Sequence, residues 1–143
     1  METRFRRVLN LTLILLVIGI VHGACGSSEA PTSGALLVRR RPRGADEKPV
    51  WAIHFSVPDI PEPGAMEYET DRVRFLGRGR TSANPAAVGA GGRLSQTTGP
   101  VLDPVFSLRR RVRLDPGASA RVVFATGAAD TRSAAMGIAE QFS

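Results

Sequence analysis

The chain has 143 residues, of which 43% are hydrophobic and 22% are charged, and it carries a net charge of +6. This length suits one domain and excludes a large catalytic barrel, which takes about 250 residues, together with an accessory domain. Because 18 of the 19 basic residues are Arg, whereas a dedicated nucleic-acid binder usually mixes Arg and Lys, we expect no nucleic-acid partner.

Cysteine and histidine are too scarce for the usual metal sites. The chain has one cysteine, Cys25, and two histidines, His22 and His54. A single cysteine excludes an internal disulfide and a cysteine metal cluster. Two histidines need several organised carboxylates to hold zinc, and no pattern of that kind stands out. We therefore expect no metal and no cofactor.

Residues 1–25 have the layout of a secretory signal. Three arginines within the first seven residues precede an apolar run over residues 8–21, which only Asn10 and Thr12 interrupt, and small residues follow. The run is short for a stable anchor, which needs about 20 apolar residues. It predicts an N-terminal hydrophobic helix that directs the chain to the membrane, with few contacts to the rest. We expect a membrane-associated or exported, periplasmic-side protein of a bacterium.

Cys25 follows Ala24 directly, as in a bacterial lipoprotein cleavage site, although His22 stands where an aliphatic residue is usual. Two interpretations stay open: lipidation at Cys25, or a spare thiol beside a signal-peptide cleavage site. Residues 26–34 are small and polar, which predicts a flexible linker.

Residues 35–143 predict antiparallel β structure with one closing helix. Strands are expected over residues 35–39, 50–57 and 66–69. In the second of these the odd-numbered residues share one apolar face, which makes Trp51 a core residue. Thr70 or Asp71 is expected to cap a single helical turn that ends at Gly77.

The strongest strand signals lie over residues 105–114 and 120–126, and an Asp-Pro-Gly-Ala sequence between them predicts a turn and an antiparallel hairpin. Arg110 interrupts the apolar face of the first strand. Arg109, Arg111 and Arg113 share the opposite face, for which a solvated surface and a polyanion-binding stripe are the alternatives.

The Ala-rich tail predicts a helix over residues 131–142, with Asp130 as its N-cap. A partial antiparallel β-sandwich domain over residues 35–143 follows from these elements.

Three alternating carboxylates are the strongest hint of chemistry. Glu67, Glu69 and Asp71 share a face of an extended strand, and paired carboxylates can run acid–base chemistry on sugars. Arg72 and Arg74 follow directly, which favours an exposed, ion-paired surface. No serine has an organised His and Asp partner, so we assign no catalytic residue.

Two long motifs resemble one family. Residues 68–80 (YETDRVRFLGRGR) resemble the ETDR-x-RF-x-GRGR segment of bacterial cyclic β-1,2-glucan synthases. Residues 98–111 resemble the G-x-x-LDP-x-FSLRRR segment of the same proteins, and residues 114–132 continue the match. The resemblance covers about residues 34–143.

The resemblance implies much that composition does not. These synthases are very large inner-membrane proteins whose carboxy-terminal part is similar to cellobiose phosphorylase and related glycoside phosphorylases. That part begins with a β-super-sandwich of galactose-mutarotase-like fold, followed by a linker helix and an (α/α)6 barrel that holds the catalytic acid. The resemblance stops before the barrel, so we expect a partial β-super-sandwich without activity of its own. A truncated gene and a stand-alone module both remain open.

The function expected from the sequence is therefore a carbohydrate-binding-type β-sandwich fragment of a glucan synthase or glycoside phosphorylase. Tyr68, Arg72 and Arg78 are the candidate contacts to a β-glucan, and a separately encoded barrel is the candidate partner. The alternative is an exported structural or interaction protein anchored through Cys25.

Overall fold

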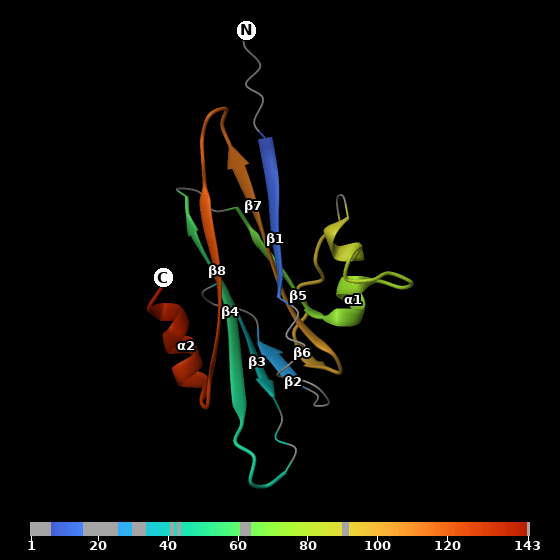
Figure 1. Cartoon of the computed structure of the whole chain (residues 1–143), viewed down its shortest axis with the longest axis vertical. Helices are drawn as coiled ribbons and strands as arrows, with labels where there is room; N and C mark the ends of the chain where they lie inside the picture. Colours follow the sequence, from blue (N-terminus) through green and yellow to red (C-terminus); the bar gives the residue numbers. More distant parts are fainter. Residues whose placement is uncertain are drawn as a thin grey trace.

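The chain folds into two antiparallel β-sheets packed face to face, as Figure 1 shows for the computed structural model. The structure describes residues 7–15, 26–29, 34–40, 42, 44–60, 64–89 and 92–142. The strands are β1 (Arg7–Leu15), β2 (Gly26–Glu29), β3 (Ala35–Arg40), β4 (Val50–Asp59), β5 (Met66–Asp71), β6 (Gly99–Val101), β7 (Pro104–Leu114) and β8 (Arg121–Ala129). The helices are α1 (Arg72–Leu76), a 3-10 turn η1 (Ala86–Val88) and α2 (Arg132–Glu140).

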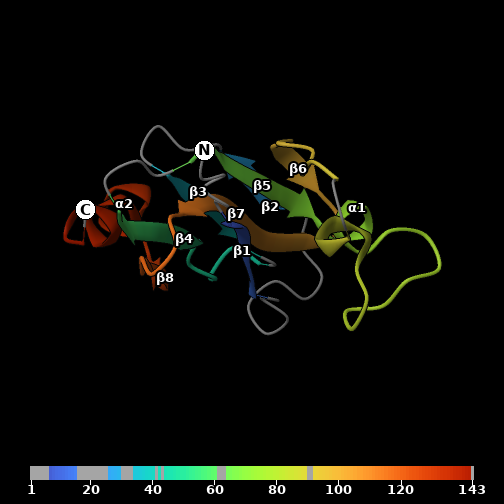
Figure 2. The same ribbon diagram turned by 90° about the horizontal axis from the view of Figure 1, so that it is seen from above.

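The described strands form a three-stranded sheet in the order β1-β7-β5 and a five-stranded sheet in the order β6-β2-β3-β4-β8. All their pairings are antiparallel. The helix α2 covers the outer face of the five-stranded sheet, and α1 lies on the far side of β5 and β7 (Figure 2). Mainly antiparallel β structure with a C-terminal helix is therefore confirmed.

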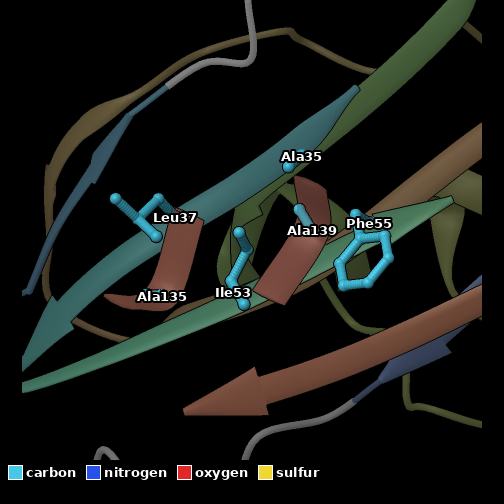
Figure 3. Packing of buried hydrophobic residues seen from close by; sticks show 6 residues of the cluster. All are labelled: Ala35, Leu37, Ile53, Phe55, Ala135 and Ala139. Atoms are coloured by element: carbon cyan, nitrogen blue, oxygen red, sulfur yellow. The ribbon is translucent and has the colours of Figure 1, made fainter. Parts of the chain in front are cut away.

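Two apolar clusters lie on the two faces of β3 and β4. The outer cluster packs α2 against the sheet, as Figure 3 shows, and consists of Ala35, Leu37, Ile53, Phe55, Ala135 and Ala139. The inner cluster lies between the sheets and consists of Leu36, Val38, Ala52, Phe106 and Leu108. Alternation along the strands sends successive side chains to the two clusters, so both faces of this sheet are buried.

The apolar face expected on residues 50–57 is confirmed, with one addition. Trp51 packs against the outer cluster but stays partly exposed, with the Arg39 guanidinium carbon 5.8 Å from its ring centroid. The opposite face of β4 is equally buried, because the three-stranded sheet covers it. Because β4 lies at the centre of a layered fold, helix α2 packs on one of its faces and the three-stranded sheet on the other. The alternation along β4 therefore does not mark one face as exposed to solvent.

The hairpin expected between residues 105–114 and 120–126 is wrong. The turn itself forms, since the Ala118 amide donates to the Asp115 carbonyl at 3.0 Å and Gly117 has φ +79. However, β7 pairs with β1 and β5, whereas β8 pairs with β4 in the other sheet. Turn chemistry reverses the chain locally but does not decide whether the flanking strands share hydrogen bonds, and here the turn crosses from one sheet to the other.

The helix expected over residues 8–21 is also wrong where the structure describes it. Arg7–Leu15 form strand β1, which pairs with β7 from Arg7 opposite Leu114 to Leu15 opposite Phe106. A short apolar run satisfies both a helix and a strand, and pairing along one edge of the long strand β7 selects the strand. Contacts with the sandwich are extensive rather than few. The remainder of the run, and Cys25, lie outside the described residues.

Two smaller expectations change as well. Gly26–Glu29, within the expected linker, form strand β2 between β3 and β6. The N-cap of α2 is Thr131 rather than Asp130, because the Thr131 hydroxyl accepts the Ala134 amide at 3.1 Å. In the described part of the chain, no helix reaches the length and apolar character needed to cross a membrane.

A histidine is buried between the sheets. His54, on the inner face of β4, is fully buried, with ring centroids of Phe106 and Phe124 at 5.7 and 6.2 Å. Its Nδ1 lies 2.8 Å from the Thr126 hydroxyl, while Nε2 has no hydrogen-bond partner among the residues that the structure describes. Burial disfavours the charged ring and lowers the pKa of His54 from 6.5 to about 4. The ring is therefore neutral in the folded protein at pH 7.

Acidification is expected to destabilise the fold through His54. The unfolded chain protonates this ring near pH 6.5, whereas the folded chain does so only near a pKa of about 4. The contribution is therefore fully present above pH 6.5 and is lost as the pH falls toward 4, by about 3 kcal/mol in total. Urea unfolding as a function of pH measures it. In His54→Phe, whose ring does not titrate, this part of the pH slope should vanish, and equal slopes in the two proteins would refute the assignment.

Candidate functional site

The segment after β5 folds into a lobe on the outer face of β5 and β7. We call residues 72–97, as far as the structure describes them, the outer lobe; it contains α1 and η1 (Figure 1). Its first helix is capped as expected, because the Asp71 Oδ1 accepts the Val73 amide at 2.8 Å and the Arg74 amide at 3.4 Å. Gly77, with φ +79, ends it. Asp71 thus has a structural task at the entrance to the lobe.

Glu69 holds the end of the lobe against β5. It is 2% exposed, and its Oε1 accepts the amides of Thr70 and Asp71, both at 3.0 Å. Its Oε2 accepts the amide of Ser95 at 3.3 Å. Three backbone donors therefore converge on one carboxylate, which fixes a returning segment that has no regular secondary structure of its own.

Glu67 works beside Glu69 and adds an ion pair. Its Oε2 accepts the Leu94 amide at 3.2 Å and lies 3.4 Å from Arg109 Nη1. The guanidinium of Arg109 also donates to the carbonyls of Gly92 and Ala87. The arginine therefore connects β7, β5 and the loop of the lobe in one network.

The position of Arg109 corrects an expectation. The alternation places it on one face with Arg111 and Arg113, for which a solvated surface is one alternative, yet it is only 7% exposed. Arg111 and Arg113 are exposed. The face is divided because the outer lobe covers β7 at Arg109 and leaves the later part of the strand open to solvent.

No two of the three alternating carboxylates therefore form an exposed pair. Glu67 and Glu69 serve the lobe and Asp71 caps α1, so their oxygens already accept hydrogen bonds from the backbone. The lobe residues that Glu67 and Glu69 hold, Leu94 and Ser95, lie 26 or more residues further along the chain, which is why the alternation alone could not reveal these roles.

The three candidate sugar contacts lie in three different surroundings. Tyr68 is partly buried on the inner face of β5, against the cluster between the sheets. Arg72 is tied to Asp103, with Nη1 2.8 Å from Oδ2 and the backbone amide 3.0 Å from the carbonyl oxygen. Arg78 is exposed in the turn after α1. The structure therefore does not assemble these three residues into one site.

One feature of the outer lobe was missed. From Arg72 to Leu102 the sequence holds five arginines, Arg72 included, and no acidic residue, a charge pattern that the sequence alone shows. Arg78, Arg80 and Arg93 are exposed, and so are the polar residues Thr81, Ser82 and Asn84. The lobe is thus a cationic surface rich in hydrogen-bond donors. No group of three or more metal-ligating side chains occurs within the described ranges.

An antiparallel β-sandwich with a covering helix and an ordered polar lobe is the class of domain that these observations define. The glycosyl hydrolase 94 supersandwich domain matches residues 24–143, and the chain belongs to this family. Over 95 residues it is 41% identical to the cyclic beta-(1,2)-glucan synthase NdvB of Rhizobium meliloti (strain 1021). That match covers 66% of this chain but 3% of the synthase, so the chain spans a small part of its relative. The resemblance drawn from the motifs is confirmed.

Replacing Glu69 by Gln is expected to loosen the outer lobe. The amide keeps the size of the side chain but turns one acceptor into a donor, so one buried backbone N–H loses its partner at a cost of about 1–3 kcal/mol. Hydrogen exchange should accelerate most at the Ser95 amide. The exposed Glu140→Gln, in α2, is the matched control. Unchanged exchange at Ser95 in Glu69→Gln would contradict the assigned role.

Proposed function

We propose that the chain is a non-catalytic, carbohydrate-binding-type β-sandwich module of a glycosyl hydrolase 94 protein. The observation that carries this proposal is the use of its alternating carboxylates. General acid catalysis on a sugar needs a carboxyl within hydrogen-bond reach of the glycosidic oxygen. Here the oxygens of Glu67, Glu69 and Asp71 are engaged in holding the outer lobe and α1.

The outer lobe is the part of the surface that suits a sugar chain. Its exposed arginine, hydroxyl and amide side chains can hydrogen-bond to sugar hydroxyls. Arg78 is the best placed of the three candidate contacts, since Arg72 is held by Asp103 and Tyr68 lies against the inner cluster. The name of the related synthase supports a β-1,2-linked glucan as the first ligand to test.

We further propose that a catalytic barrel, on the same or a separately encoded chain, docks beside α1. Three exposed aliphatic side chains support this position: Val73, Val88 and Leu102, which are 70%, 49% and 90% exposed. The bonds between Arg72 and Asp103 hold the segments that carry Val73 and Leu102 beside each other. Such groups favour a protein contact over open solvent.

The purified chain is expected to bind β-1,2-glucan without cleaving it. Titration calorimetry should detect binding that Arg78→Ala weakens about tenfold, the loss expected for one hydrogen bond from a charged donor. Incubation with the glucan or cellobiose, with and without phosphate, should release neither sugar phosphate nor reducing ends.

Arg121→Ala, an exposed arginine on β8 in the other sheet, is the matched control for binding. Equal loss in both variants would show a general charge effect and argue against a site on the lobe. Product release above a heat-killed control, abolished in Glu69→Gln or Asp71→Asn, would overturn the non-catalytic assignment.

The second proposed function is an exported structural or interaction protein that is anchored to the membrane through Cys25. The basic start, the apolar run and the Ala24-Cys25 pair support it. Cleavage before Cys25 would also remove the residues of β1 from the mature chain and free one edge of β7. The anchored protein would therefore lack β1, and its three-stranded sheet would keep only β7 and β5.

Labelling of a bacterial host with radioactive palmitate tests this anchor. The label is expected on the wild-type chain and not on Cys25→Ser, and the labelled protein should have lost its first 24 residues. A chain that keeps Arg7–Leu15 and carries no label would refute both the cleavage and the anchor.

A further inference from the structure

Strand β8 ends the five-stranded sheet on one side, and its outer edge is open. In Figure 2 it lies at the margin of the sheet beyond β4, with which it pairs without interruption from Arg121 opposite Asp59 to Ala129 opposite Trp51. None of its nine residues is buried, and no second strand pairs with it in the described part of the chain. Since alternate residues of an antiparallel strand bond the neighbour on one side, the others direct their amides and carbonyls outward.

The edges at β5 and β6 are protected, whereas the edge at β8 is not. The returning chain of the outer lobe lies along β5, where the Gln96 amide donates to the Tyr68 carbonyl at 3.0 Å. Strand β6 has three residues and contains Pro100, which has no amide hydrogen. From Val122 to Ala129, β8 has no charged residue, no proline and no bulge. Proteins usually blunt a long edge with one of these features, because an open edge is a template for another strand.

The sequence of β8 is complementary to itself in size. Its first four residues are large and its last four are small, with Ala125 between them. When two copies of the strand run antiparallel with Ala125 opposite Ala125, every large side chain lies opposite a small one. The pairs are Arg121 with Ala129, Val122 with Ala128, Val123 with Gly127, and Phe124 with Thr126. Because directly opposite side chains are in contact, this order of sizes favours a second copy of the chain, which supplies the order in full.

Charge and exposed apolar surface fit the same arrangement. Arg121 begins β8 and Asp130 follows its last residue, and both are exposed. The pairing therefore places each Arg121 within one residue of Asp130 of the other copy, so that opposite charges meet at both ends. On the outer face Ile138 of α2 lies over Gly127, where a Cβ would be 3.0 Å from its Cδ1. Val123, which is 49% exposed, would be covered by Gly127 and Ile138 of the other copy.

We propose that β8 is a dimerisation edge, at which two copies of this chain pair their β8 strands antiparallel about Ala125 and join their five-stranded sheets into one. The two-fold axis passes between the two Ala125 residues, perpendicular to the sheet. Both α2 helices therefore lie on one side of the joined sheet and both three-stranded sheets on the other. The interface uses neither the outer lobe nor the surface beside α1, so it is independent of the sugar binding and of the barrel docking proposed above.

Sedimentation velocity of the full chain over a range of concentrations tests the dimer. The wild type should sediment as a dimer that dissociates on dilution. Val123→Lys should raise the dissociation constant at least about tenfold, because each dimer would bury two lysines in place of two valines. Val88→Lys, the same change at a valine of equal exposure in the outer lobe, is the matched control and should leave the constant unchanged. If Val123→Lys does not fold, Ala128→Lys, at an exposed residue, takes its place.

Crosslinking tests the register, in a Cys25→Ser background so that no other thiol reacts. Directly opposite residues have Cβ atoms about 4.5–5.5 Å apart, so a short bifunctional thiol reagent should join two chains of Ala125→Cys. The two substituted positions of Val123→Cys would lie about 13 Å apart along the strands, and a reagent too short for that distance should leave this variant uncrosslinked.

Three outcomes would overturn the proposal. The first is a wild-type chain that stays monomeric up to about 1 mM, since a weaker contact is not a specific dimer. The second is a dimer on which Val123→Lys and Val88→Lys have the same effect, because the contact would then lie on another surface. The third is crosslinking that does not favour Ala125→Cys over Val123→Cys, because the two β8 strands would then not pair about Ala125.

Discussion

The burial of β3 and β4 on both faces is the constraint on which the rest of the structure depends. Leu37 and Ile53 face α2, while Leu36 and Ala52 face the second sheet. A slip of one residue in the pairing would exchange the two sets of side chains. The register of the five-stranded sheet is therefore specified from both sides, which fixes where α2 and β7 can pack.

The outer lobe follows from that arrangement. Once the inner face of β7 packs on β3 and β4, its other face carries Ser107 and Arg109 outward, and both residues are buried beneath chain that returns over them. Carboxylates on the neighbouring strand β5 then hold that chain through its backbone amides. Charged residues thus hold the lobe together with its buried Phe75 and Leu94, and the lobe keeps a polar, arginine-rich exterior.

How much of this could be predicted depends on the range of each interaction. Strand positions followed from the alternation of side chains, and the cap at Asp71 followed from donors two and three residues away. The roles of Glu69 and Arg109 in holding the lobe did not follow, because the lobe residues that they bond, such as Ser95 and Gly92, are distant in sequence. The hairpin failed for a related reason: its turn is a local feature, whereas the choice of β4 rather than β7 as the partner of β8 is made by the packing of the two sheets. The surroundings of the candidate sugar contacts could not be predicted either, since one segment of sequence places Tyr68 against the inner cluster and Arg78 at the surface.

The two buried side chains between the sheets, His54 and Arg110, differ in how burial affects their charge. The buried ring of His54 stays neutral, with the Thr126 hydroxyl at one ring nitrogen and two phenylalanine rings beside it. Its burial therefore costs the folded state little free energy at a pH above its ordinary pKa of 6.5. Arg110 has no neutral form to adopt, so its desolvation cost persists at every pH at which the protein folds. An apolar side chain of similar volume would fill the same layer without that cost. A histidine in such a place is explained by packing alone, whereas the arginine keeps its charge and meets it with the Gly64 carbonyl and the Ser56 hydroxyl.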